Sequence, residues 1–266
     1  MARKVRLDAE LVRRGLARSR EQATGLIVAG QVAVSGQTAA KPATQVGQDA
    51  AIVIRRPDDG PDYASRGGHK LAGALAAFAG VRVQGRRCLD AGASTGGFTD
   101  VLLRGGAAEV VAADVGYGQL AWSLRADPRV TVLDRVNVRN LQPAQVAPAP
   151  GLVTADLSFI SLTHVLPALV ACAADDADFV LLVKPQFEVG KGRVGAGGVV
   201  RDSVLRAEAV VTVAGSALGV GLGVRGVTAS PLPGPSGNVE YFLWLRRGAP
   251  PLDQAELQRA IEEGPQ

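Results

Sequence analysis

The sequence of 266 residues has only two cysteines, two histidines and one methionine, and aromatic residues make up 4% of it. Two cysteines are too few for the disulfide framework of a small secreted protein. Cys88 and Cys172 both stand in apolar surroundings, so we expect buried thiols rather than redox chemistry. With only His69 and His164 besides, a structural zinc site has too few ligands, and no metal is expected.

Long apolar runs are also missing. No stretch approaches the roughly 18–20 consecutive apolar residues of a membrane-spanning helix. The first residues, Met1-Ala2-Arg3-Lys4-Val5-Arg6, lead into charged sequence and not into the apolar core of a signal peptide. We therefore expect a cytoplasmic protein with no membrane association. Hydrophobic residues make up 47% of the chain, which excludes intrinsic disorder as a description of the whole.

The net charge of +4 is unevenly distributed along the chain. Residues 1–57 contain ten Lys and Arg against four Asp and Glu, a net +6, which leaves −2 for the other 209 residues. A short basic end on a near-neutral body is typical of a polyanion-binding module, although a solvated Arg-rich face has the same composition. Only five of the 29 basic residues are Lys, and Lys can be tuned as a base where Arg cannot, which draws attention to Lys70 and Lys184.

The first 57 residues predict a small α+β domain. Residues 6–17 place Leu7, Leu11 and Val12 on one helical stripe that is stopped near Gly15, and residues 20–29 form a second helix. Short strands follow at 32–34 and 51–54. Pro, Gly and Asp then predominate, so we place a linker at 58–65.

Beyond the linker, helix-length segments alternate with short apolar runs. A helix is predicted over 70–78, and strands over 87–90, 109–114, 130–133, 151–156, 179–184 and 239–245. This alternation predicts an α/β domain with a doubly wound, mostly parallel sheet. We assign residues 66–250 to this domain and 251–266 to a polar tail.

The sharpest local signal is a glycine-rich segment, Leu89-Asp90-Ala91-Gly92-Ala93-Ser94-Thr95-Gly96-Gly97-Phe98-Thr99, between a strand and a helix. Such a loop lets the backbone approach a ligand, and Asp114 at the end of the next strand is placed to bind ribose hydroxyls. The loop does not match G-x-G-x-x-G, so it fits S-adenosylmethionine better than a dinucleotide. A glycine-rich turn kept for packing is the alternative.

Two polar residues fall at the carboxyl ends of predicted strands, Asp156 and Lys184. Ligands of open α/β sheets bind outside these ends, so we expect both side chains to converge with the glycine loop. Spacing alone brings neither Lys70 nor Glu240 into such a site.

Taken together, the motifs resemble one family, the TlyA (haemolysin-A-like) ribosomal RNA 2′-O-methyltransferases, over essentially all residues to about 247. The resemblance implies an alpha-L RNA-binding module, like the S4 domain of a ribosomal protein, fused to a seven-stranded Rossmann-like methyltransferase domain. The strings that carry it are Ser65-Arg66-Gly67-Gly68-His69-Lys70-Leu71, Asp90 to Thr99, Ala113 to Leu120, Ala155-Asp156-Leu157-Ser158-Phe159-Ile160-Ser161-Leu162, Val183-Lys184-Pro185-Gln186-Phe187-Glu188 and Ser236-Gly237-Asn238-Val239-Glu240-Tyr241.

The resemblance also implies the site residues. The family's catalytic tetrad falls on Lys70, Asp156, Lys184 and Glu240, with Lys184 as base or alkoxide stabiliser, Asp156 orienting it, and Glu240 positioning Lys70 or the ribose. We expect S-adenosylmethionine to be bound by Asp90, Gly92, Ser94, Thr95, Gly96, Gly97, Phe98, Asp114, Val115, Asp156 and Phe159. RNA contacts are expected from Arg3, Lys4, Arg6, Arg18, Arg20, Lys41, Arg66, Arg135 and Arg139, as one face that runs across the linker.

The implied substrates are cytidines of 16S and 23S rRNA within the 30S and 50S subunits, with an influence on susceptibility to capreomycin-like antibiotics and no obligate protein partner. Three alternatives remain open: a nicotinamide-dependent oxidoreductase, a non-catalytic RNA-binding assembly factor and a haemolysin-like pore former. One departure concerns the linker, which often carries Arg and Trp in the family and here reads Pro61-Asp62-Tyr63-Ala64.

Overall fold

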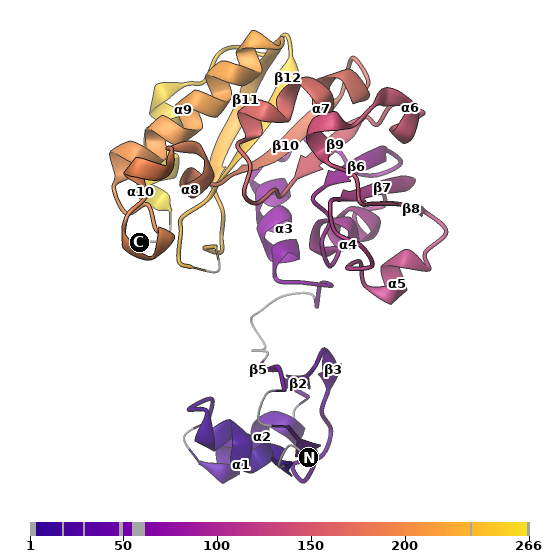
Figure 1. Ribbon diagram of the computed structural model, residues 1–266, viewed down its shortest axis with the longest axis vertical. Helices are drawn as coiled ribbons and strands as arrows, with labels where there is room; N and C mark the ends of the chain where they lie inside the picture. Colours follow the sequence, from indigo (N-terminus) through magenta and orange to yellow (C-terminus); the bar gives the residue numbers. More distant parts are fainter. Residues whose placement is uncertain are drawn as a thin grey trace. The chain divides into compact units, whose positions relative to one another are not determined.

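The computed structural model describes residues 4–17, 19–28, 30–47, 50–54, 62–234 and 236–264. The chain divides into two compact units, Met1–Asp62 and Tyr63–Gln266 (Figure 1). Two of the predicted RNA contacts, Arg3 and Arg18, lie outside the described residues, as do positions 58–61 of the predicted linker.

The N-terminal unit has the predicted α+β composition. Its helices are α1 (Leu7–Arg13) and α2 (Arg20–Val28), and its three-stranded sheet has the order β3 (Gln37–Thr38), β2 (Val32–Val34), β5 (Ile52–Ile54). A further pair joins β1 (Val5–Arg6) to β4 (Gln45–Val46). Leu7, Leu11 and Ile27 are fully buried between these elements. The first helix ends at Arg13, and the chain turns at Gly15, where a stop was predicted, with a φ of +70°.

The larger unit is built on a seven-stranded sheet with the order β11-β12-β10-β9-β6-β7-β8. Its strands are β6 (Arg87–Ala91), β7 (Glu109–Asp114), β8 (Val130–Asp134), β9 (Leu152–Ala155), β10 (Asp178–Val183), β11 (Leu222–Ala229) and β12 (Tyr241–Arg247). The five strands from β10 to β8 are parallel, and β12 runs antiparallel to both of its neighbours. The predicted fold class, a doubly wound and mostly parallel sheet, is confirmed.

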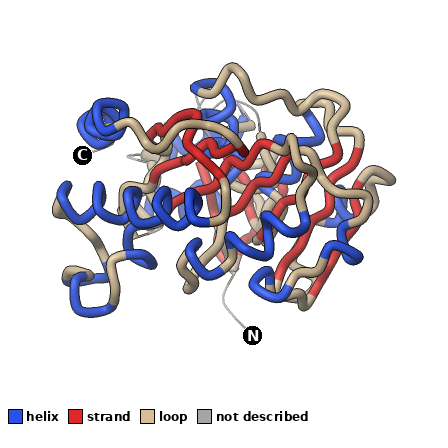
Figure 2. Tube along the Cα trace, turned by 90° about the horizontal axis from the view of Figure 1, so that it is seen from above, coloured by secondary structure: helices blue, strands red, loops and turns tan. Residues whose placement is uncertain are grey.

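Helices cover both sides of this sheet (Figure 2). They are α3 (Gly67–Ala77), α4 (Gly97–Arg104), α5 (Trp122–Arg125), α6 (Pro143–Val146), α7 (Leu166–Cys172), α8 (Pro185–Glu188), α9 (Ser203–Gly219) and α10 (Gln254–Glu263). Because side chains alternate along a strand, neighbours such as Cys88 and Leu89 enter opposite cores. Cys88 belongs to the core that includes α3 and α4, and Leu89 to the one that includes α7, α9 and α10.

The structure corrects two predictions from the sequence and confirms a third. The seventh strand, β11, was absent from the predicted elements. Residues 251–266, predicted as a polar tail, contain α10, whose Leu257, Ala260 and Ile261 are buried against the sheet. Cys88 and Cys172 are both buried free thiols, as predicted. Within the described ranges, no helix combines the length and the hydropathy needed to cross a membrane.

Candidate active site

The glycine loop joins β6 to α4 at the carboxyl end of the sheet. Gly92 has a φ of +87°, and a Cβ there would lie 2.6 Å from the carbonyl oxygen of Asp156, so glycine lets this loop touch the end of β9. Gly96 has a φ of +98°, and its Cβ position is filled by the side chains of Leu120 and Leu124. Gly96 therefore serves packing, whereas Gly92 shapes the junction of two strand ends.

Two adjoining cavities open at these strand ends, and both are lined by Gly92, Ser94, Asp156 and Ser158. The larger, of about 520 Å³, extends toward the end of β7; its further lining includes Asp114, Val115, Gln119, Asn137 and Phe159. The smaller, of about 220 Å³, extends toward the start of α3; its further lining includes Arg66, Lys70, Thr95, Gly97, Phe98 and Lys184. Most of the predicted site residues thus surround one continuous region.

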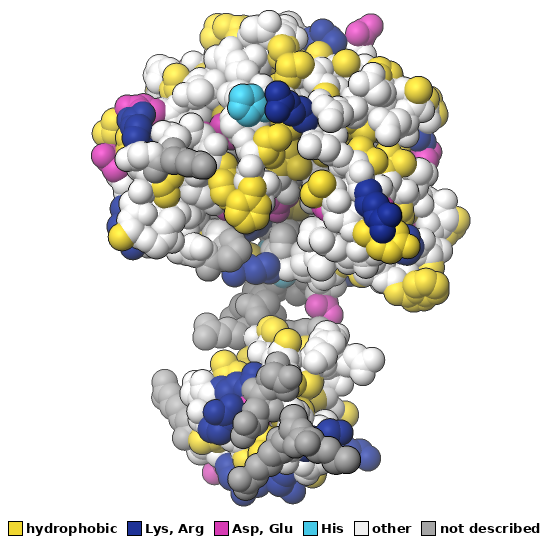
Figure 3. All heavy atoms as spheres, viewed as in Figure 1, with side chains coloured by type: hydrophobic (Ala, Val, Ile, Leu, Met, Phe, Trp, Pro, Cys, Tyr) yellow, Lys and Arg dark blue, Asp and Glu magenta, His cyan; other side chains and the backbone are white. Residues whose placement is uncertain are grey.

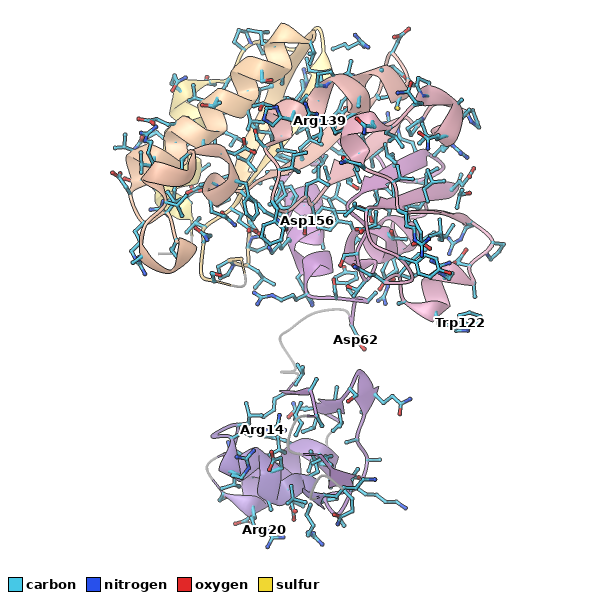
Figure 4. All side chains as sticks on the ribbon, in the orientation of Figure 1. Arg14, Arg20, Asp62, Trp122, Arg139 and Asp156 are labelled. Carbon is cyan, nitrogen blue, oxygen red and sulfur yellow. The ribbon has the colours of Figure 1, made fainter. Side chains whose placement is uncertain are left out.

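Two ion pairs stand at the smaller cavity. Lys184 Nζ lies 2.5 Å from Asp156 Oδ1 and donates a hydrogen bond to Ser158 Oγ at 3.1 Å. Lys70 Nζ donates to Glu240 Oε2 at 2.5 Å, with the two residues 5% and 1% exposed. Figure 4 labels Asp156, near the centre of the larger unit. The structure therefore brings the four residues of the predicted tetrad together as two compensated pairs.

The short helix α8, directly after Lys184, connects the elements that carry these pairs. Gln186 Nε2 donates to Glu240 Oε1 at 3.4 Å, next to β12. Glu188 accepts hydrogen bonds from Ser161 Oγ at 2.5 Å and from the backbone N–H of Leu162 at 2.9 Å, in the segment after β9. Burial raises the pKa of Glu188. The single turn of α8 thus joins the segment after β9 to the residue before β12, on either side of β10.

Asp114, at the end of β7, has a carboxylate fixed by two backbone donors. Its Oδ2 accepts from the N–H of Ser94 at 2.8 Å and its Oδ1 from that of Gly116 at 2.7 Å. Each carboxylate oxygen keeps capacity for a further hydrogen bond, and the residue is only half-buried at the larger cavity. This placement fits the predicted binding of ribose hydroxyls.

Two predicted cofactor residues, Asp90 and Gly96, line neither cavity. Asp90 is fully buried beneath the glycine loop, where Thr99 Oγ1 donates to its Oδ2 at 2.7 Å. Burial raises the pKa of Asp90 to about 7. Asp90 therefore stabilises the loop from its buried side and does not line either cavity.

At the rim, Phe159 is 92% exposed and its ring lies 5.4 Å from that of Phe187, centroid to centroid. Gln119 and Asn137 also line the larger cavity and were missed by the sequence reasoning. Asn137 follows the end of β8, so the rule that ligands bind beyond the carboxyl ends of strands could have found it.

The predicted RNA contacts that the structure describes are all exposed and lie within their separate units. Lys4, Arg6, Arg20 and Lys41 belong to the N-terminal unit, where basic side chains are prominent in Figure 3. On the larger unit, Arg66 donates to the carbonyl oxygen of Pro233, Arg135 stacks over the ring of Tyr117 at 4.4 Å, and Arg139 follows β8.

Comparison with known proteins agrees with this geometry. The FtsJ-like methyltransferase family matches residues 63–247, and the S4 domain family matches residues 5–52. The fold and the site therefore define a methyltransferase of the FtsJ-like class that carries an S4 RNA-binding domain.

Relatives that match the chain over nearly its whole length identify the particular family within this class. The chain is 63% identical, over the whole length of both proteins, to the 16S/23S rRNA (cytidine-2′-O)-methyltransferase TlyA of Mycobacterium tuberculosis. It is 40% identical to the putative rRNA methyltransferase YqxC of Bacillus subtilis, over 98% of this chain and 94% of that one. A solved structure of a putative hemolysin from Streptococcus thermophilus superposes with a TM-score of 0.77 at 36% identity, over 99% of this chain and 96% of that one. The chain belongs to the TlyA family.

Proposed function

We propose that this chain is an S-adenosylmethionine-dependent 2′-O-methyltransferase that modifies cytidines of 16S and 23S rRNA within the ribosomal subunits. The observation that carries the proposal is the meeting of the Lys184–Asp156 and Lys70–Glu240 pairs beside a cavity flanked by Asp114 and the glycine loop. The substrate class is supported by the relatives whose names specify rRNA cytidine methylation and by the S4 domain.

The residues present fit S-adenosylmethionine. The larger cavity offers the Asp114 carboxylate for ribose hydroxyls, and the amides of Gln119 and Asn137 as further polar partners. Gly92 and Ser94, shared by both cavities, would hold the junction between the nucleoside and the methionine end. When bound, the cofactor supplies an electrophilic methyl group and becomes a neutral thioether.

Lys184 has the geometry of a group that stabilises a developing alkoxide. An ammonium group has three N–H donors, of which Ser158 takes one, while the Asp156 carboxylate lies at ion-pair distance and balances the charge. No other hydrogen bond of Lys184 is formed in the part of the chain that the structure describes, and Lys184 lines the smaller cavity, so its ammonium can donate to the ribose 2′-oxygen as the proton of that hydroxyl passes to solvent. Electrostatic stabilisation by a preorganised donor, together with placement of the oxygen in line with the methyl group, lowers the barrier.

Lys70 and Glu240 complete the charge balance of the site. Because Glu240 compensates Lys70, a second ammonium can stand at the cavity without leaving a buried charge unpaired. Lys70 then orients the ribose, and Glu240 acts through Lys70. Binding to folded RNA relies on phosphates and shape, for which the basic N-terminal unit and Arg66, Arg135 and Arg139 are suited. Without the methyl groups, susceptibility to capreomycin-like antibiotics would change.

The decisive experiment compares methyl transfer to ribosomal subunits by Lys184→Ala and by Arg82→Ala, a control that removes one exposed positive charge from the same unit. We expect Lys184→Ala to lose transfer while its dissociation constant for S-adenosylmethionine stays close to that of the parent, and Arg82→Ala to retain both. Wild-type turnover by Lys184→Ala would contradict the assignment.

Two further readouts separate the alternatives. Thermal stabilisation by NAD and not by S-adenosylmethionine would favour an oxidoreductase. Tight subunit binding by the parent without any methyl transfer would favour an assembly factor, and mapping 2′-O-methyl groups in rRNA from cells with and without the gene would show the modified positions.

A further inference from the structure

Asp8, at the start of α1, is an acid buried within the most basic part of the chain. It is 3% exposed, and both of its carboxylate oxygens are fully used. Oδ1 accepts from Arg6 Nε at 3.0 Å and from the N–H of Ala9 at 2.8 Å. Oδ2 accepts from Arg6 Nη2 and from Arg20 Nη2, both at 2.9 Å. A carboxylate offers about four acceptor positions, and all of them are occupied here.

Among the described residues, Asp8 engages only part of the N–H donors of Arg6 and Arg20. A guanidinium has five N–H donors, and Asp8 takes two from Arg6 and one from Arg20. Their side chains are 46% and 60% exposed. Figure 4 labels Arg20 at the start of α2, where Ser19 Oγ accepts from the N–H of Gln22 and so defines the first turn of the helix. The hydrogen bonds to Asp8 therefore hold both guanidinium groups in fixed positions, from which their remaining N–H donors can reach a ligand.

Lys41 is tied to the same place through the backbone. The N–H of Asp8 donates to the carbonyl oxygen of Pro42 at 3.1 Å, and that of Leu7 donates to Thr44 at 2.8 Å. These two hydrogen bonds attach the backbone of Pro42 and Thr44, next to Lys41, to the start of α1. Two exposed arginines from separate segments thus meet at one buried carboxylate, and the backbone next to Lys41 is bonded to the same turn.

The second buried acid of this unit, Glu10, works differently. It accepts from Arg13 and Arg14, but Arg14 also donates to the carbonyl oxygen of Ala50 at 2.7 Å and is only 23% exposed. Glu10 and Arg14 thus attach the chain at Ala50 to α1, and so they stabilise the fold of this unit. Asp8 also joins two elements, because Arg20 lies on α2, but both of the arginines that it holds are exposed.

We infer that Asp8 is a positioning residue of the RNA-binding surface, which fixes Arg6 and Arg20 as a two-armed clamp for the phosphates of one RNA strand. The inference rests on the proposed function only in taking RNA as the ligand. A clamp held in place loses less side-chain freedom on binding, and this gain outweighs the negative charge that Asp8 places behind it. The acid therefore strengthens binding to a polyanion.

The test uses two substitutions that raise the net charge of the N-terminal unit equally. Asp8→Asn keeps the shape and one strong acceptor, and Glu21→Gln changes an exposed acid on α2. Charge alone predicts that both bind ribosomal subunits more tightly than the parent. Positioning predicts that Asp8→Asn binds about five- to tenfold more weakly, whereas Glu21→Gln binds at least as tightly as the parent. Dissociation constants are measured on the full chain over a salt series.

A second set of variants distinguishes the loss of arginine positioning from the loss of the folded structure. In the double variant Arg6→Gln/Arg20→Gln, adding Asp8→Asn should no longer weaken subunit binding. A penalty that persists undiminished in that background, or an Asp8→Asn chain that binds as tightly as Glu21→Gln, overturns the inference. Methyl transfer is scored separately, so a parent that binds subunits but transfers no methyl group refutes the proposed function and not the role of Asp8.

Discussion

Lys70 and Glu240 are 170 positions apart in the sequence, and the structure joins them through a 2.5 Å contact between Nζ and Oε2 in which both side chains are almost completely buried. The pair connects the first turn of α3 to the residue before β12. A buried pair of this kind is costly to break from one side, because the remaining charge has no water and no partner.

The first prediction concerns this pair. Glu240→Gln should lower the free energy of unfolding by about 3–5 kcal/mol, which corresponds to roughly 6–20 °C in melting temperature for a domain of this size. The double variant Lys70→Met/Glu240→Leu should recover most of that loss, since it buries no charge, and should remain without methyl transfer. Equal melting temperatures for Glu240→Gln and the parent would show that Lys70 finds another partner.

The second prediction concerns the cofactor pocket. Asp114→Ala should raise the dissociation constant of S-adenosylmethionine about tenfold or more, because the variant cannot form a charge-assisted hydrogen bond to the ribose. Asp134 pairs with Asp114 in the register of β7 and β8, forms an ion pair with Arg125 and lines neither cavity. Asp134→Ala is therefore the matched control, and calorimetric titration should give it a constant near that of the parent. Equal constants for both variants would place the ribose elsewhere.

The third prediction is a pH dependence. Because burial raises the pKa of Asp90 from 3.8 to about 7, the folded chain binds more protons than the unfolded chain between these values, and stability falls as pH rises through that window. Asp90→Asn stays neutral and keeps an acceptor for Thr99. Its free energy of unfolding relative to the parent should therefore rise from about pH 4 to about pH 7 and then level off.

Urea titrations across this range test the prediction, with Asp127→Asn as control. The hydrogen bond from Arg129 lowers the pKa of Asp127, so its contribution is lost only at more acidic pH. Asp127→Asn should show a constant difference from the parent over the same window, and a constant difference for Asp90→Asn would mean that Asp90 is ionised throughout.

The fourth prediction concerns α8. Glu188→Ala removes the acceptor of Ser161 and Leu162, which releases the segment after β9 from the turn after Lys184. We expect single-turnover methyl transfer to slow by tenfold or more, while S-adenosylmethionine binds with little change. Glu188→Gln keeps an acceptor for the Leu162 N–H and should restore much of the rate. Glu208→Ala, which removes the exposed partner of Arg193, is the control. A rate for Glu188→Ala equal to that of this control would leave Glu188 without a positioning role.

The fifth prediction concerns the binding of RNA by the N-terminal unit. Reversal of Arg6 and Arg20 to Glu should weaken binding to ribosomal subunits, and it should flatten the log–log salt dependence by about 0.7–0.9 for each phosphate group that the variant no longer neutralises. S-adenosylmethionine affinity should be unaffected. If binding to the subunits stayed unchanged across the salt series, the excess of basic residues in 1–57 would be an ordinary solvated surface with no part in RNA binding.

Local sequence was enough to predict most of the fold. The parallel strands other than the edge strand β8 are short apolar runs that are largely buried, and a polar or turn-forming residue ends or follows each of them, so β6 to β10 could be placed from the local sequence pattern. The strand β11 could not, because Arg225, two glycines and a register shift between Val224 and Gly226 interrupt its pattern. The helix α10 was not predicted either, because its sequence is largely polar, although Leu257, Ala260 and Ile261 recur at helical spacing.

The sequence by itself therefore determined the fold class, the basic N-terminal domain and the convergence of Asp156 with Lys184, because each follows from residues that are near in the chain or at equivalent ends of parallel strands. Tertiary structure alone decided that Lys70 meets Glu240, that α8 links the segment after β9 to the residue before β12, and that Asp8 binds both Arg6 and Arg20. These contacts depend on how separate elements pack, and no local pattern of hydrophobic or charged residues encodes the distance between two side chains on different elements.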